Sequence, residues 1–207
     1  MSQRHQGLYR LLYHPGFYQW FQNLLGEDRF AREVVKGLLR PRPGDRVLDI
    51  GCGTGNLLNH LREVEYTGLD NNPRYIEHAR NRYGDRGAFM TGDVTTLRTR
   101  LDGERRFEIV SLLCVTHHLP DQMVLDLFRV CKTLLAEGGR LCLVDPCFHP
   151  GQPFIARHLA ERDRGEHVRS VREYERLIHA VFSEARTEIR QGILRIPYSH
   201  LFLEAVG

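Results

Sequence analysis

The chain has 207 residues, which is enough for one α/β domain with a buried core. Hydrophobic residues make up 42% and charged residues 27%, and these ordinary values exclude a disordered chain. The formal net charge of +3, with arginines scattered along the chain, argues against nucleic-acid binding. No stretch approaches the roughly 18 apolar residues of a spanning helix, and the first residues lack a signal core, so we expect a cytoplasmic protein without a membrane span.

The five cysteines do not have the spacing of a metal site or a redox motif. None belongs to a C-x-x-C pair, and most stand among apolar residues. We therefore expect reduced, packed thiols and no bound metal.

The first 40 residues have a helical pattern and are rich in aromatic side chains, among them Tyr13 and Tyr18. A second helix in this stretch has Phe30, Val34 and Leu38 on one face. The extension could form a lid that excludes water from a site, or its aromatic residues could attach extra helices to the sheet. Both interpretations stay open. A turn rich in proline and glycine ends it at residues 40–45.

Strands and helices alternate from residue 45 onward. We expect strands at 46–50, 66–70, 88–91, 107–113 and 140–144, and helices at 56–63, 73–84 and 121–135. This alternation predicts a parallel sheet covered by helices on both sides, a Rossmann-like α/β sandwich. We expect one domain over 1–207, with a helical extension at 1–40 and the core at 45–207.

The last 60 or so residues follow a weaker pattern. A helix is expected at 154–164, and the pair Ser170 and Glu173 has the spacing of a capping box that opens another helix. Two strands from about 185 to 206, around a turn at 196–198, predict a closing antiparallel hairpin.

The strongest signal is the stretch VLDIGCGTGN at residues 47–56. A buried strand runs into a loop with glycine at every second position, and glycine allows sharp turns and close approach of a ligand to the main chain. The third glycine comes one residue earlier than in the dinucleotide pattern G-x-G-x-x-G, and the chain has no P-loop string. The loop therefore favours a nucleoside ligand that lacks phosphates.

Two acidic residues follow the next strands. Asp70 ends the second strand, where a carboxylate accepts hydrogen bonds from the two hydroxyls of a ribose. Asp93 follows the third strand, where a carboxylate could accept from an adenine amine. Taken singly, each could be a helix cap or a turn residue, but their order at successive strand ends favours a common site.

The chain resembles the class I S-adenosylmethionine-dependent methyltransferases. The matching pieces are VLDIGCGTG, YTGLDNN, TGDV, FEIVSLLCVTHHLPD and LLAEGGRLCLVDP, which span residues 47–146 in the order of the family. The resemblance implies a seven-stranded sheet whose last two strands form the hairpin, S-adenosyl-L-methionine as cofactor, and S-adenosyl-L-homocysteine as product.

The resemblance also implies a role for each matching residue. The methionine part of the cofactor would lie on the loop of Gly51, Cys52, Gly53 and Gly55, next to the main chain of Cys114. Behind the loop, Asp49 would bind the amino end through water. The remaining contacts would be made to the ribose by Asp70 and to adenine by Asn71, Asp93 and Val94.

The residues expected on the acceptor side are less well marked. His117 and His118 follow the fourth strand and titrate near working pH, so either could be a general base, or either could pack against the cofactor or cap the next helix. Further pocket candidates are Tyr13, Tyr18, Asp145, His149, Arg164 and Arg169. An arginine among these could bind a carboxylate or phosphate of the acceptor, or pair with acids in a surface loop.

The short chain favours a small-molecule acceptor, since it leaves little room for docking a macromolecule. Alternatives are methylation of RNA or protein, or a cofactor-binding protein without catalysis. The early third glycine argues against an NAD-dependent oxidoreductase. The pattern does not indicate which acceptor atom is methylated, and it leaves a monomer or a homodimer open.

Overall fold

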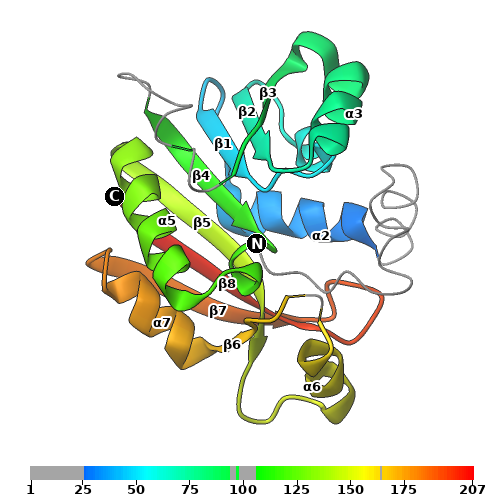
Figure 1. Ribbon diagram of the computed structural model, residues 1–207, viewed down its shortest axis with the longest axis vertical. Helices are drawn as coiled ribbons and strands as arrows, with labels where there is room; N and C mark the ends of the chain where they lie inside the picture. Colours follow the sequence, from blue (N-terminus) through cyan, green and yellow to red (C-terminus); the bar gives the residue numbers. More distant parts are fainter. Residues whose placement is uncertain (1–25, 94–96, 98–105, 164) are drawn as a thin grey trace.

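The computed structural model describes residues 26–93, 97, 106–163 and 165–207 (Figure 1). Strands and helices alternate around one twisted sheet, as the pattern predicted. The expected N-terminal helix before Gly26 lies outside the described residues, together with Tyr13, Tyr18, Val94 and Arg164.

Seven strands follow one another across the sheet in the order β3-β2-β1-β4-β5-β8-β7 within the described residues. The first five are parallel to their neighbours, and β8 runs antiparallel to both β5 and β7. A two-residue strand, β6 (Arg169–Ser170), pairs with the end of β5. The predicted Rossmann-like sheet with a C-terminal antiparallel hairpin is therefore confirmed. The strands are β1 (Arg46–Ile50), β2 (Glu65–Asp70), β3 (Gly87–Thr91), β4 (Phe107–Leu113), β5 (Leu135–Phe148), β7 (Glu184–Gln191) and β8 (Ser199–Val206).

Helices cover both faces of the sheet and complete three layers (Figure 1). α5 (Asp121–Leu134) and α7 (Val171–His179) pack on one face. The other face carries α2 (Glu27–Val34), its continuation η2 (Val35–Leu39), the short helix η3 (Asn56–His60) and α3 (Pro73–Tyr83). α6 (Phe154–Glu161) follows β5 at the carboxyl edge. Across the part of the chain that the structure describes, no helix combines the length and apolarity that a bilayer span requires.

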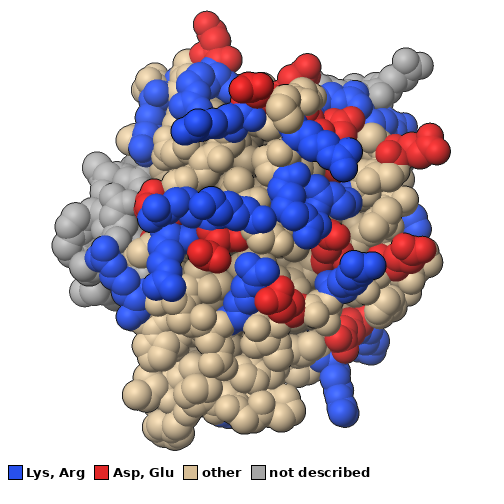
Figure 2. Space-filling model, turned by 180° about the vertical axis from the view of Figure 1, so that it is seen from behind, with Lys and Arg blue, Asp and Glu red and all other residues tan. Residues whose placement is uncertain are grey.

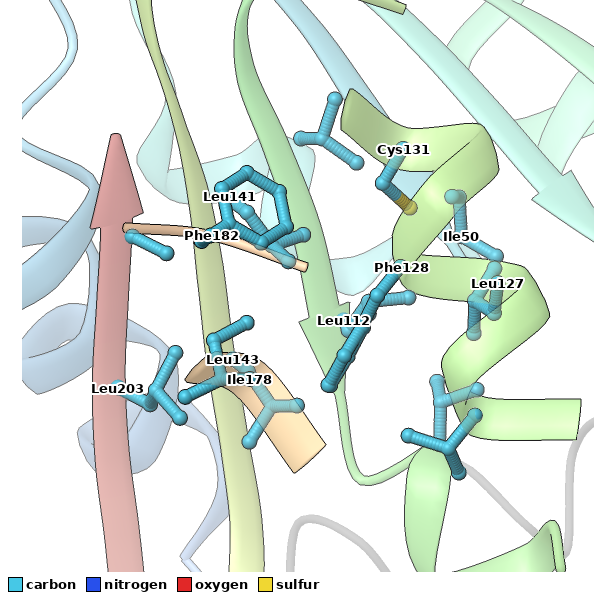
Figure 3. Packing of buried hydrophobic residues seen from close by; sticks show 14 of the residues in the cluster. Ile50, Leu112, Leu127, Phe128, Cys131, Leu141, Leu143, Ile178, Phe182 and Leu203 are labelled. Carbon is cyan, nitrogen blue, oxygen red and sulfur yellow. The ribbon is translucent and has the colours of Figure 1, made fainter. Parts of the chain in front are cut away.

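The larger core lies between the sheet and the helices α5 and α7 (Figure 3). Leu127, Phe128 and Cys131 recur at helical spacing on α5 and face the strand residues Leu112 and Leu143. All five are 2% exposed or less, so this interface excludes water along the middle of the sheet. The spacing of these apolar residues in the sequence is typical of such a buried helix face.

The boundary between α5 and β5 differs from the expectation. In the sequence, Gly138 and Gly139 have the pattern of a helix end and the strand is expected from residue 140, but the helix stops at Leu134 and β5 begins directly at Leu135. The pairing with β4 shifts register between Phe107 and Ile109, so the glycines form a bulge inside the strand. A Cβ on Gly139 would lie 2.8 Å from the carbonyl oxygen of Phe107, which explains the glycine there.

Other predicted boundaries hold to within a few residues. The helix expected at 56–63 is only the short turn η3, and β5 extends past residue 144 to Phe148. The capping box is present: Glu173 N–H donates to the Ser170 hydroxyl at 3.4 Å, and Ser170 N–H donates to the Glu173 carboxylate at 2.7 Å. The helix α7 that it opens buries Tyr174, as predicted.

Truncation of Phe128 should measure the contribution of the α5 interface. We expect Phe128→Ala to lower the free energy of unfolding by about 3–5 kcal/mol, because it leaves a cavity in a fully buried layer. Urea denaturation monitored by circular dichroism would measure the change. As a control, Phe154→Ala removes a ring that is 79% exposed and should change stability by no more than about 0.5 kcal/mol. Equal losses in both variants would contradict the assignment of Phe128 to the core.

Candidate functional site

The glycine loop after β1 takes a conformation that side chains oppose. Gly51, Gly53 and Gly55 have φ angles of 79°, 54° and 78°, in the left-handed region. A Cβ on Gly51 would lie 2.5 Å from a methyl carbon of Val115. Gly51 N–H donates to the carbonyl of Leu69 at 2.7 Å, which anchors the loop to the end of β2. The loop is thus a bare backbone cradle at the carboxyl edge of the sheet.

Asp70 joins this loop to the end of β2. One carboxylate oxygen accepts from Gly53 N–H at 2.9 Å, and the other accepts from Asn72 N–H at 2.8 Å. Burial raises the pKa of Asp70, while the backbone donors from Asn72, Gly53 and Asn71 act in the opposite direction. The carboxylate therefore lies directly beside the glycine loop, as the sequence predicted.

Asp49 lies beneath the loop and is almost fully buried. The Tyr66 hydroxyl and the Ser111 hydroxyl each donate to it at 2.7 Å. Burial raises the pKa of Asp49 to about 6, against the effect of these two hydroxyls. Because each oxygen already has a protein donor, Asp49 connects β1 to both neighbouring strands. Its predicted water-mediated contact with a ligand stays a prediction.

The other residues predicted for the cofactor lie along the same edge. Asn71 is exposed and Asp93 half-buried, directly after β2 and β3, and both make further contacts. Cys52 is buried within the loop. Cys114 follows β4 with φ at 57°, and its N–H donates to Val144 at 2.7 Å. Val94 lies outside the described residues.

A second polar group lies across the sheet edge, at the ends of β4 and β5. His117, in the turn η5 (Thr116–His118), is 4% exposed, and Asp145 on β5 is fully buried. The His117 Nδ1 is 2.6 Å from a carboxylate oxygen of Asp145. The other oxygen of Asp145 accepts from Thr116 N–H at 3.0 Å and also from the Thr116 hydroxyl.

The opposite side of the His117 ring faces another carboxylate. Its Nε2 lies 3.4 Å from an oxygen of Asp163, which also accepts from Gly165 N–H at 2.7 Å and from the Tyr198 hydroxyl. Burial opposes the charge on His117, but Asp145 and Asp163 outweigh it, so the pKa of His117 is raised. Two carboxylates around one imidazole favour its protonated form.

The geometry around His117 bears on its expected role as a general base. Both of its nitrogens face carboxylates and its pKa is raised, which favours the protonated ring, and its role in catalysis stays a prediction. The ring of His118 packs against it with centroids 4.0 Å apart and is half-buried. Of the two histidines, His118 is the more exposed, and its surroundings favour the role of general base more than those of His117 do.

Arg169 pairs with an acid, one of the two alternatives for the arginines, but it is buried and not in a surface loop. It is 4% exposed, and its guanidinium donates to Asp121 at 2.9 Å and to the carbonyls of Thr116, Leu119 and His167 at 2.6–3.0 Å. These four bonds leave little capacity for an acceptor carboxylate. Its contacts instead fasten the turn that carries the two histidines.

His149 lies outside this group. Its Nε2 is 3.1 Å from the Ser199 hydroxyl at the start of β8. Three pocket candidates, Tyr13, Tyr18 and Arg164, lie outside the described residues, so their roles stay predictions.

Sequence reasoning missed His200, Tyr198 and the role of Asp163. His200 is 2% exposed, between the rings of Phe30 and Tyr198 at 5.4 Å from each. Its Nδ1 has no hydrogen-bond partner within the described residues, and burial lowers its pKa to about 4. The pairing of Pro146 with His200 brings it to the site, and only the strand register reveals that proximity. The charged stretch around Asp163 was the one available signal.

A family model for a methyltransferase domain matches residues 24–187, well over half of the chain. The chain belongs to the S-adenosylmethionine-dependent methyltransferases. It is 27% identical over 186 residues to a phosphoethanolamine N-methyltransferase of Triticum aestivum, covering 86% of this chain and 36% of the relative. It is 33% identical over 126 residues to the 27-O-demethylrifamycin SV methyltransferase of Amycolatopsis mediterranei (strain S699), covering 57% and 43%. The chain thus spans less than half the length of these two relatives.

A solved methyltransferase shares the fold over nearly its whole length. The structure of the magnesium protoporphyrin IX methyltransferase of Synechocystis PCC 6803, with bound S-adenosylhomocysteine, superposes with a TM-score of 0.69. The match covers 95% of this methyltransferase and 96% of that chain at 22% identity. At this identity the likeness shows the fold alone.

The residues at the loop fit the cofactor of the family. Gly51 and Gly55 leave no room for a Cβ, because Val115 and Phe89 pack against them, and the half-buried carboxylate of Asp70 stands beside this loop, whose main chain a ligand can approach. Neither lysine nor arginine occurs in residues 47–61, which suits a ligand without phosphates. Backbone atoms and one acid are the donors and acceptors that an amino-acid group and a ribose need.

The methyltransferase should lose stability with rising pH through His117. Because its folded pKa is raised, its contribution is fully present below the ordinary pKa of about 6.5 and is lost as pH rises through the folded pKa. We expect His117→Gln to remove this component from the pH profile of unfolding free energy, and Asp163→Asn to reduce it. Urea titrations at roughly pH 6 and roughly pH 9 would measure it.

His149→Gln provides the matched control, since His149 has no ion-pair partner within the described residues. This variant should keep the pH dependence of the wild type. An unchanged profile in His117→Gln would show that the ring is not held as a cation.

Proposed function

We propose that this methyltransferase transfers a methyl group from S-adenosylmethionine to a small-molecule acceptor bound between β4, β5 and the start of β8. The observation that carries the proposal is the Asp70 carboxylate beside a glycine loop without dinucleotide spacing. We keep the single-domain boundaries of 1–207, with the extension at 1–40 and the core at 45–207, and the cytoplasm as its compartment.

The cofactor supplies an activated methyl group, so the protein mainly has to place the acceptor in line with the sulfonium carbon. In our proposal, Asp70 binds the ribose hydroxyls, and Asn71 and Asp93 contact the adenine. The loop of Gly51, Cys52, Gly53 and Gly55 lies against the methionine part, next to the main chain of Cys114. Asp49 supports that loop from below through the Tyr66 and Ser111 hydroxyls.

Two histidines in different electrostatic environments lie on the acceptor side. His117 stays a cation between Asp145 and Asp163, and His200 stays neutral with an unpartnered Nδ1. An unsatisfied buried nitrogen gains from a polar ligand, so we place the polar end of the acceptor near His200. His118 is the candidate base for an acceptor that must lose a proton. The small polar groups favour a metabolite over a macromolecule, in line with relatives named for phosphoethanolamine and a demethylrifamycin.

Binding of S-adenosylhomocysteine, measured by isothermal calorimetry, tests the cofactor site. We expect Asp70→Asn to weaken binding roughly 30-fold, because two charge-assisted bonds to the ribose are worth about 2 kcal/mol. Asp126→Asn, on the exposed side of α5, should bind like the wild type, since Asp126 contacts only Gln122 and Arg129 within the described residues. Wild-type affinity in Asp70→Asn would remove that residue from the site.

Transfer of a radiolabelled methyl group tests the acceptor class. We expect purified protein with labelled S-adenosylmethionine to label the metabolite fraction of an extract, and to leave protein and RNA unlabelled. His118→Asn should reduce turnover at least tenfold while cofactor affinity is kept. Label in protein or RNA would contradict the small-molecule acceptor. No label in any fraction, despite cofactor binding, would favour a binding protein without catalysis.

A further inference from the structure

In α6 the small apolar side chains are buried and the large ones are exposed, the reverse of a core helix. It buries Ala156 and Ala160, which are 2% and 3% exposed, and it leaves Phe154 79% and Ile155 61% exposed. A helix normally turns its large apolar side chains to the core, because their burial removes the most surface from water. Within the described residues, Phe154 and Ile155 are the two most exposed large apolar side chains.

The segment that leads into this turn contains no charged residue. No lysine, arginine, aspartate or glutamate occurs in residues 146–156, from the end of β5 into α6. α6 stands away from the body of the sheet (Figure 1), and the lower part of the back face forms a lobe nearly free of charged side chains (Figure 2). A contiguous uncharged surface with large apolar groups marks a contact site.

Basic side chains follow directly on the same helix. The side chain of Arg157 is 56% exposed, and its guanidinium lies 5.3 Å from the ring centroid of Phe148. Arg162, one turn further, contacts the ring of His158 at 2.8 Å. The one acid of the helix, Glu161, pairs with Arg157 at 3.1 Å. Asp163 faces His117, so the exposed charges that follow the tip are two arginines and one acid, and this small positive excess complements the boundary between acyl chains and anionic headgroups.

The size of the tip also distinguishes a lipid surface from a protein partner. A stable protein interface buries about 800 Å² on each side with matched shape. Two side chains on one helical turn form a knob far smaller than that, and fluid lipid chains accept a knob without shape complementarity. The tip therefore suits a membrane surface better than a folded partner.

We propose that the first turn of α6 docks on an anionic lipid surface, with Phe154 and Ile155 among the acyl chains and Arg157 and Arg162 at the phosphates. The end of α6 is attached to the acceptor side, because the Tyr198 hydroxyl bonds to Asp163 and lies 3.5 Å from the carbonyl of Leu159. Docking therefore turns the acceptor side of the sheet edge toward the lipid. This inference does not depend on the proposed function, since lipid binding needs neither cofactor nor turnover.

Co-sedimentation of the full chain with vesicles tests the docking. The probes are vesicles of phosphatidylcholine and phosphatidylglycerol in equal parts, and vesicles of phosphatidylcholine alone. We expect binding to the anionic vesicles, weakened roughly tenfold by Phe154→Ser and again by Ile155→Ser. Arg162→Gln should weaken binding to the anionic vesicles about fivefold and leave binding to the neutral vesicles unchanged.

Ile189→Ser is the matched control, because Ile189 is a large apolar residue, 40% exposed, on β7. It should bind vesicles like the wild type. Calorimetry with S-adenosylhomocysteine on the same variants shows whether the fold and the cofactor site are intact, since the side chains of Phe154 and Ile155 are exposed and lie outside the core and the cofactor site.

Three outcomes would overturn the proposal. The wild type could fail to sediment with anionic vesicles, or Phe154→Ser and Ile155→Ser could bind as well as the wild type. Alternatively, these variants could change the mass of the protein in light scattering without changing vesicle binding, which would assign the tip to a second copy of the chain. Failure to bind S-adenosylhomocysteine would contradict the proposed function and leave the docking result standing.

Discussion

Buried and half-buried carboxylates at the carboxyl ends of parallel strands are the constraint on which the site depends. Asp49 on β1, Asp70 on β2 and Asp145 on β5 lie where helices cover the sheet on both sides. An uncompensated charge there would cost several kcal/mol. The chain compensates each one with donors from a neighbouring strand or loop, so the acids also determine how the strand ends connect.

The compensation differs across the sheet edge and divides the site into two parts. Neutral donors, the backbone N–H groups and hydroxyls, satisfy Asp70 and Asp49. Asp145 has the His117 cation as well. The first arrangement leaves a carboxylate able to accept from a neutral ligand such as a ribose. The pair of Asp145 and His117 holds two charged groups in fixed positions, which stabilises the turn η5 on the acceptor side.

The sequence allowed most of the fold and the cofactor side to be predicted. The alternation of strands and helices can be recognised from local periodicity, and the residues of the glycine loop are adjacent in the sequence, so both are visible without tertiary contacts. The extended β5 was missed because Gly138 and Gly139 have the pattern of a helix end, whereas the bulge depends on contact with Phe107. Both glycine roles look the same along the chain, and only the strand partner distinguishes them.

The acceptor side was predicted less well, because its residues come together only through tertiary pairing. His117 was expected to be a general base, to pack against the cofactor or to cap the next helix, and the carboxylates that flank it stand 28 and 46 positions further along the chain. His200 reaches the site through the register of β8 against β5. Arg169 was expected either to bind a ligand or to pair with acids, and its four acceptors are Asp121 and three backbone carbonyls that no side-chain pattern reveals.

The group around Asp163 links the proton on His117 to the position of α6. Asp163 faces the His117 ring on one side and accepts from the Tyr198 hydroxyl, which also contacts α6 at Leu159. Loss of the His117 proton would leave two acids facing each other across a neutral ring, with Asp145 buried and Asp163 the one nearer the surface. Repulsion would then act on Asp163, just after the end of α6, because Asp145 lies within the central strand β5. The helix that carries the exposed apolar tip is therefore held in place by the same charge that organises the acceptor side.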